Sequence, residues 1–143
     1  MFSQFFKKQI NKVSFEDMQF IIQNPDQFIL INTLPMTEQQ YLILSTLPCE
    51  KEESTINNLL SNYETNSKHI IIYGKNVNDE SVEKKYNQIV ALGFTYVFIY
   101  SGGMFEWVLM QDIYGMEEFP TTDYTLDILK FKPNRALTAR LLM

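Results

Sequence analysis

The stretch that most constrains the fold of this chain is HIIIYGKNVNDES, which runs from His69 to Ser81. Its apolar run ends at Gly74, a short polar loop follows, and a helix is predicted to begin at Asn78 or Asp79. A strand, a loop and a helix start in this order are typical of a parallel α/β sheet. Because the first N–H groups of a helix have no partner within the helix, the sequence has the outline of an anion-binding loop.

Apolar runs and helical spacing alternate along most of the chain. Strands are predicted at residues 28–31, 41–44, 69–73 and 94–100. Helices are predicted from Ser14 to about residue 23, over 52–63, from 78 or 79 to Gly93, and over 104–114. Strands alternating with helices of about three turns imply right-handed crossovers. The predicted fold class is therefore α/β, with three layers: a central, mostly parallel sheet and helices on both of its faces.

Length, charge and cysteine content limit the function classes. A chain of 143 residues with 45% hydrophobic residues is expected to form one folded domain. The net charge of −5 argues against a nucleic-acid partner, which would need a dense basic face. No apolar run is long enough to predict a transmembrane segment. The single cysteine can form no internal disulfide, so we expect a reducing intracellular compartment, cytoplasmic or within a virion or organelle assembly.

Four segments, in the right order, resemble the rhodanese-like domain family. They are SFED at residues 14–17, FILINTLP at 28–35, IIIY with its loop at 70–73, and FIYSGGMFEW at 98–107. The glycine pair Gly102-Gly103, followed four residues later by Trp107, is the most specific piece. The chain also resembles short rhodanese-like proteins of large DNA viruses and of protists.

The resemblance divides the chain into three parts. Residues 1–12 would be an N-terminal arm or helix with Phe2, Phe5 and Phe6 on one face. Residues 13–116 would be the rhodanese-like domain, and residues 117–143 a C-terminal extension. The glycine pair is predicted to make a tight strand-to-helix turn, because phosphate-binding loops need further glycines at fixed spacing.

In the rhodanese-like family a cysteine closes the central strand and carries sulfur as a persulfide. The resemblance places that cysteine position at Gly74, which has no side chain and can be neither nucleophile nor sulfur carrier. We therefore expect a vestigial active-site loop, no catalytic residue, no metal and no cofactor. The loop consists of Gly74, Lys75, Asn76, Val77, Asn78, Asp79 and Glu80.

Two carboxylates at the helix start weaken the case for an anion ligand. Asp79 and Glu80 are ordinary N-terminal helix acids, which already complement the positive end of the helix dipole. Recognition of a basic partner is the functional alternative for them. Cys49, the only thiol, precedes several carboxylates, which raise a thiol's pKa, and it lies outside the loop. His69, the only histidine, is expected to be a solvated residue at a strand entry.

The leading hypothesis is a catalytically inactive rhodanese-like protein that binds protein partners or forms a homo-oligomer, with a structural subunit of a large assembly as one form of this role. Apolar residues near both ends, such as Phe131, Leu137 and Leu141, favour this hypothesis. The alternative is a small-ligand or sulfur-handling enzyme that uses the retained loop, with Lys75, Asn76 and Asn78 as polar contacts, or that uses Cys49.

Overall fold

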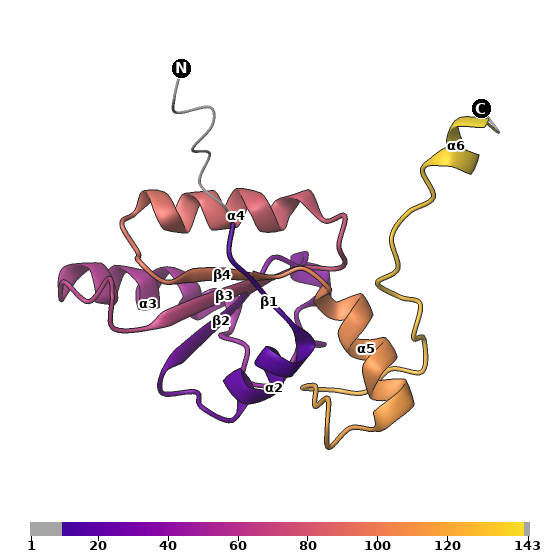
Figure 1. The fold of residues 1–143 in the computed structure, drawn as a ribbon, viewed down its shortest axis with the longest axis horizontal. Helices are drawn as coiled ribbons and strands as arrows, with labels where there is room; N and C mark the ends of the chain where they lie inside the picture. The colour runs from indigo at the N-terminus through magenta and orange to yellow at the C-terminus, as the bar shows by residue number, and fades with distance from the viewer. Residues whose placement is uncertain (1–9, 142–143) are drawn as a thin grey trace.

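The computed structural model describes residues 10–141, which fold around one parallel sheet (Figure 1). The four strands lie side by side in the order β1 (Lys12–Val13), β4 (Val97–Tyr100), β3 (His69–Tyr73) and β2 (Phe28–Asn32), and every pairing is parallel. The other elements are α2 (Phe15–Ile22), η1 (Met36–Glu38), α3 (Cys49–Ser61), α4 (Glu80–Ala91), α5 (Gly103–Tyr114) and α6 (Leu137–Leu141). The predicted parallel α/β fold is confirmed.

The helices form two layers, one on each face of the sheet. Successive side chains of a strand point to opposite faces, so Ile71 and Tyr73 of β3 join one core cluster and Ile70 and Ile72 join the other. The first cluster is closed by α2 and α5, the second by α3 and α4. Because β3 is covered on both faces, its continuous apolar run is what a central parallel strand requires.

The helix boundaries follow from local chemistry. Ser14 caps α2 in a reciprocal capping box with Asp17, as the sequence predicts. Asp79 is the N-cap of α4, and Gly93 follows that helix with a left-handed φ of 103°. The helix predicted over residues 52–63 begins three residues earlier, at Cys49, directly after Pro48.

The strand predicted at residues 41–44 is wrong. Tyr41, Leu42 and Ile43 are buried, but this segment makes only an isolated bridge from Ile43 to Thr121. Its backbone groups find other partners: Ile43 N donates to the Tyr73 hydroxyl, 3.2 Å away, and Leu42 N donates to Thr122 Oγ1, 3.0 Å away. Backbone bonds to residues 120–122, from Leu44 N to the Pro120 carbonyl and from Thr122 N to the Leu42 carbonyl, complete the set, and the apolar run is a buried loop rather than a strand of the sheet.

The sheet gains an edge strand that sequence reasoning missed. Lys12 and Val13 of β1 pair with Ile99 and Tyr100 of β4. A two-residue strand has no recognisable period, and only the tertiary contact defines it. Of the N-terminal arm expected at residues 1–12, residues 1–9 lie outside the described part of the chain, so the prediction for Phe2, Phe5 and Phe6 does too.

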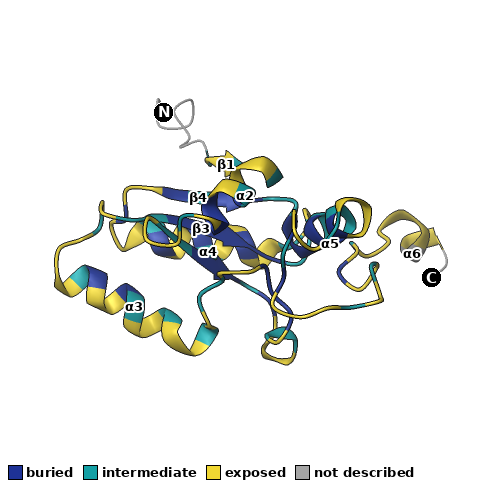
Figure 2. Cartoon of the chain, turned by 90° about the horizontal axis from the view of Figure 1, so that it is seen from below, coloured by how far each residue is buried: buried dark blue, intermediate teal, exposed yellow. Residues whose placement is uncertain are grey.

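The segment after α5 packs on the first core cluster as far as Phe131. Trp107 is fully buried, donates to the Pro120 carbonyl at 3.0 Å, and meets Phe119 edge to face. Phe131 is also fully buried and stacks on Tyr41. Beyond Phe131 the chain leaves the domain and ends in α6, which lies apart from the layers (Figures 1 and 2). Among the described residues, no helix has the length and apolarity to cross a membrane.

We predict that Tyr73→Phe destabilises the fold. The Tyr73 hydroxyl is buried, accepts from Ile43 N and lies 2.7 Å from Thr46 Oγ1. Its loss leaves a buried N–H without a partner, which costs about 1–3 kcal/mol. Urea denaturation measures the change. Tyr63→Phe is the control because Tyr63 is 92% exposed, and equal effects of the two substitutions would contradict the prediction.

Candidate functional site

The loop from Gly74 to Asp79 lies at the carboxyl end of β3, where α/β sheets commonly bind ligands. The start of α5 covers it from one side. Met104 N donates to the Gly74 carbonyl at 2.9 Å, and Phe105 N donates to the Lys75 carbonyl at 2.8 Å. Two carbonyl groups of the loop therefore satisfy amides that the first turn of α5 leaves free.

This close approach explains the second glycine of the pair. Gly103 has a left-handed φ of 63°, and a Cβ on it would lie 2.6 Å from the Gly74 carbonyl oxygen. Both the backbone conformation and the contact exclude a side chain. The pair is the tight strand-to-helix turn that the sequence predicts, and its place is directly against the loop.

Gly74 has no room for a side chain. A Cβ on Gly74 would lie 2.5 Å from Val82 Cγ2 and 2.7 Å from Thr33 Oγ1, and it would overlap Asp79 Oδ2. The space above this glycine is thus filled by three neighbouring side chains. A small molecule bound by the loop directly over Gly74 would have to displace them.

The carboxylate of Asp79 occupies the inside of the loop. Its Oδ2 accepts from Lys75 N at 2.9 Å, and its Oδ1 accepts from Ser81 N at 3.1 Å and from Ser81 Oγ at 2.6 Å. These donors at a helix start are the groups that would otherwise hold an external anion. Asp79 is therefore an N-terminal helix acid, as predicted, and it also serves as the loop's own anion.

The remaining loop residues have separate roles. Asn76 accepts from Asn78 N through its Oδ1 and donates from Nδ2 to the Phe131 carbonyl at 2.9 Å. Lys75 Nζ lies 3.8 Å from Glu38 Oε1 of η1. The other carboxylate oxygen of Glu38, Oε2, is buried without a hydrogen-bond partner. Val77 is 68% exposed.

A cavity of about 700 Å³ opens beside the loop, not over Gly74. It lies between the loop residues and the chain beyond Phe131, and its lining includes Lys75, Asp79, Glu80 and Arg135. The positive charges of the two cations in this lining balance the negative charges of the two carboxylates. Glu80, in the first turn of α4, thus adds negative charge to a cavity that an anion would have to enter.

Tyr100 ends β4 next to the loop and keeps its proton. Its hydroxyl donates to Glu106 Oε1 at 2.7 Å. Burial, together with the Glu106 carboxylate, raises the pKa of Tyr100 far above its usual range. The hydroxyl is therefore a fixed hydrogen-bond donor and offers no base to the loop.

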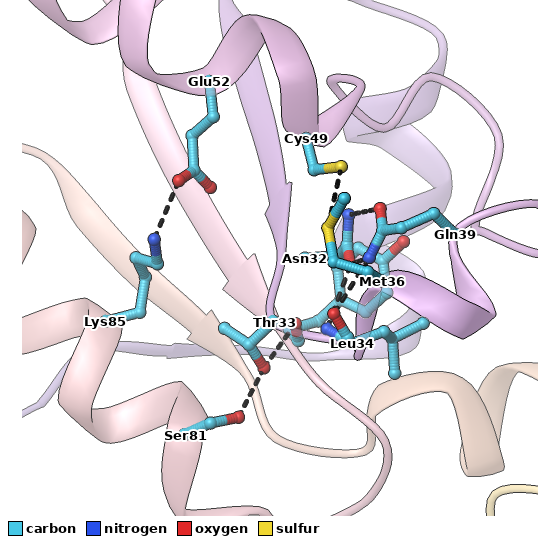
Figure 3. Close-up of polar contacts among 10 residues, drawn as sticks. Asn32, Thr33, Leu34, Met36, Gln39, Cys49, Glu52, Ser81 and Lys85 are labelled. Atoms are coloured by element: carbon cyan, nitrogen blue, oxygen red, sulfur yellow. Dashed lines mark hydrogen bonds and ion pairs between the residues drawn. The ribbon is translucent and has the colours of Figure 1, made fainter.

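Cys49 lies outside the loop, as the first residue of α3 (Figure 3). Its Sγ is 3.7 Å from Met36 Sδ and 3.5 Å from Glu50 Oε2. Partial burial of the thiol and the neighbouring Glu50 carboxylate raise the pKa of Cys49. Less thiolate is then present at neutral pH than for an ordinary cysteine.

A smaller cavity of about 370 Å³ adjoins Cys49. Its wall contains an amide pair in which Asn32 and Gln39 bond to each other, at 2.8 and 3.1 Å (Figure 3). Glu52 and Lys85 form an ion pair of 2.7 Å across it. Ser81 Oγ, which donates to Asp79, can accept from Thr33 Oγ1 at 2.8 Å and thus joins this wall to the loop.

His69 begins β3, as predicted, but it is not the solvated residue that the sequence analysis expects. The ring stacks on Tyr96 with a centroid distance of 4.5 Å, and it also lies against Phe98 and Phe28. His69 is half-buried in an aromatic cluster at the amino end of β3, whereas Cys49 contacts Met36, beyond the carboxyl end of β2. The two residues therefore form no dyad. Within residues 10–141, no group of three or more His, Cys, Asp or Glu side chains could hold a metal ion.

Sequence reasoning missed Thr33, which lines the space above Gly74, and Ser81, which donates to Asp79 and contacts Thr33. Thr33 directly follows β2, so its place at the carboxyl edge of a parallel sheet was a usable signal. Ser81 follows the predicted cap by two residues, where a hydroxyl can share the capping oxygen. Phe131, whose carbonyl holds Asn76, gives no such signal because it is 55 residues away.

The comparison with known families identifies the fold. The family model of the rhodanese-like domain matches residues 33–110, more than half of the chain. The chain therefore belongs to the rhodanese-like domain family. No curated protein sequence matches it.

Solved structures agree with this assignment. The BH2092 protein from Bacillus halodurans is 20% identical, with a TM-score of 0.58 and 80% of each chain covered. A yeast protein tyrosine phosphatase of the rhodanese family is 11% identical, with a TM-score of 0.60, over 85% of this chain and 97% of that one. A single-domain sulfurtransferase from Saccharomyces cerevisiae is 14% identical, with a TM-score of 0.52, over 76% and 96%. At these identities the likeness shows a common fold alone.

We predict that a methyl group on Gly74 is costly and that Asp79 accounts for part of the cost. Gly74→Ala should lower the free energy of unfolding by about 1–3 kcal/mol, because the site is overpacked. Asp79→Ala should cost about 1 kcal/mol through the lost cap. The double variant should lose less unfolding free energy than the two single variants lose together, by at least about 0.5 kcal/mol.

Urea denaturation of the wild-type protein, the two single variants and the double variant completes a double-mutant cycle and gives the coupling energy between positions 74 and 79. Gly74→Ala combined with Asp112→Ala is the matched control, since Asp112 is an exposed acid that does not contact Gly74. Additive losses in the Asp79 cycle would show that its carboxylate does not compete for this space.

We predict slow alkylation of Cys49 below pH 8, because its raised pKa keeps the thiol protonated. Glu50→Gln removes a neighbouring negative charge, so it should lower the pKa and speed the reaction up to about fivefold at pH 7.5, the equivalent of about 1 kcal/mol for charges 4 Å apart in water. Iodoacetamide labelling followed by mass spectrometry measures the rate. Glu117→Gln, which changes an exposed acid after α5, is the control, and an unchanged rate in Glu50→Gln would refute the prediction.

Proposed function

We propose that this rhodanese-like domain is catalytically inactive as a sulfurtransferase and that it acts as a protein-binding or structural module. The observation that carries the proposal is the filled space at Gly74. The residue that the resemblance aligns with the family's cysteine has no side chain, and Asp79, Val82 and Thr33 occupy the volume that even the Cβ of a cysteine would need.

The electrostatics of the loop support the same conclusion. A persulfide or thiolate is stabilised by amides that point at it. Here the amides of Lys75 and Ser81 already bind the Asp79 carboxylate. A second negative charge beside that carboxylate would be repelled.

The module is suited to binding because exposed apolar side chains gather near its C-terminal half. Ile113, Tyr114, Tyr124 and Leu126 are each more than 60% exposed. These four side chains lie within 14 residues of sequence, and large exposed apolar side chains favour a binding role because a protein interface would bury them.

The competing hypothesis is a small-ligand or sulfur-handling enzyme at the loop or at Cys49. The 700 Å³ cavity beside the loop, with Lys75 and Arg135 in its lining, favours it. Asp79 and Glu80 in the same lining oppose an anionic substrate, and the raised pKa of Cys49 opposes thiolate chemistry.

We predict no transfer of sulfur from thiosulfate to cyanide by the wild-type protein above the blank without protein. Thiocyanate formation measures the reaction, with a sulfurtransferase of known activity as the positive control. Gly74→Cys should also be inactive, because its thiol would face the Asp79 carboxylate, which disfavours a thiolate.

Turnover by the wild-type protein at the level of the positive control would overturn the proposal. Loss of that turnover in Cys49→Ser would then assign it to the lone thiol. For the binding role, purification of the protein from its native source should yield a companion, or a further copy, in stoichiometric amount. A protein that is consistently a lone monomer would contradict this role.

A further inference from the structure

Charge is distributed very unevenly along the chain. Residues 1–127 contain all 17 acidic residues and eight of the 12 basic ones, a net charge of −9, while residues 128–143 carry the other four basic residues, a net charge of +4. The acidic half ends in a block, residues 101–127, with six acidic residues and no lysine or arginine. This block contains α5 and the turn after it.

Residues 132–141, here called the C-terminal arm, extend this basic end away from the domain (Figure 2). Leu137 and Leu141 lie one helical turn apart on α6 and are 71% and 75% exposed. Arg135 and Arg140 are exposed on the same arm. A five-residue helix is too short to be stable by itself, so its apolar residues need a surface to pack on.

A groove between α2 and α5 has the complementary character. It has a volume of about 550 Å³, and its apolar wall contains Phe15, Met110, Tyr114 and Phe119. Glu16 and Glu118 are exposed at its rim, and no lysine or arginine lines it. The groove thus offers an apolar floor for leucines and negative charge for arginines.

The arm does not fill the groove of its own chain. No arm residue lines the groove, and both views show α6 apart from α2 and the rest of the domain (Figures 1 and 2). Residues 134–136 at the root of the arm line the cavity beside the loop of their own chain, whereas α6 at the tip of the arm and the acidic groove do not contact each other within one copy. Two copies that exchange arms would satisfy both surfaces in a closed, symmetric dimer.

We propose that the C-terminal arm of one copy docks in the α2–α5 groove of a second copy. Leu137 and Leu141 pack on the apolar wall, and Arg135 and Arg140 face Glu16 and Glu118. The proposal rests on the binding role given above and names the partner: another copy of this chain.

Two full-length variants separate the two surfaces. Leu137→Asp with Leu141→Asp blocks the arm, and Glu16→Lys with Glu118→Lys blocks the groove. All four positions are exposed, so thermal melts should show both variants folded. Leu92→Asp and Glu53→Lys with Glu83→Lys are controls at exposed positions elsewhere.

Sedimentation measures the mass of each protein at micromolar concentration. We expect a wild-type dimer whose dissociation constant rises about tenfold between 0.05 and 0.5 M NaCl, because salt screens the exposed charges. Either blocked variant alone should be at least about tenfold weaker in self-association. An equimolar mixture of the two variants should form a 1:1 heterodimer, since one retains the arm and the other the groove.

Three results would overturn the proposal: a wild-type monomer, a mixture without heterodimer, or equal weakening by the control variants. A wild-type monomer with a smaller hydrodynamic radius than the arm-blocked variant would place the arm in its own groove, and this too overturns the exchange. None of these results tests the proposal that the protein is inactive in sulfur transfer. That proposal is tested by thiocyanate formation, which would contradict it whether the protein is a monomer or a dimer.

Discussion

The carboxylate of Asp79 holds the loop of this domain together. It accepts hydrogen bonds from two backbone amides and one hydroxyl within a span of seven residues, and it begins α4 at the same time. A charged acceptor strengthens such bonds relative to neutral ones. The loop is therefore closed around an anion that the chain itself supplies, and Gly74 is compatible with this closure because it adds no atom to the crowded interior.

Much of the fold could be predicted because local signals and burial agree. The continuous apolar runs of β2, β3 and β4 are typical of strands covered on both faces, and Ser14 and Asp79 mark helix starts by their side-chain chemistry. Tyr41–Ile43 presents the same apolar pattern and forms a loop instead, because the Tyr73 hydroxyl and Thr122 satisfy its amides. Nothing in the local sequence reports such distant partners.

The sequence predicts the order of the elements that form the site, but not the hydrogen bonds inside the loop. The order of strand, loop and acidic helix start identifies Gly74 and Asp79 as neighbours along the chain. The sequence does not reveal that the Asp79 carboxylate turns back to the amide of Lys75, since either a solvated acid or an inward one fits the same residues. His69 is similar: its position at a strand start is readable, but the stacking on Tyr96 depends on a loop 27 residues later.

The hydrogen bond from Asn76 Nδ2 to the Phe131 carbonyl joins the loop to the point where the chain leaves the domain. On its other side, the loop is bonded to the start of α5 through Gly74 and Lys75. The shape of this loop therefore helps to fix the point where the chain leaves the domain, because a displacement of Asn76 would remove the side-chain hydrogen bond that holds the backbone beside the buried Phe131 ring.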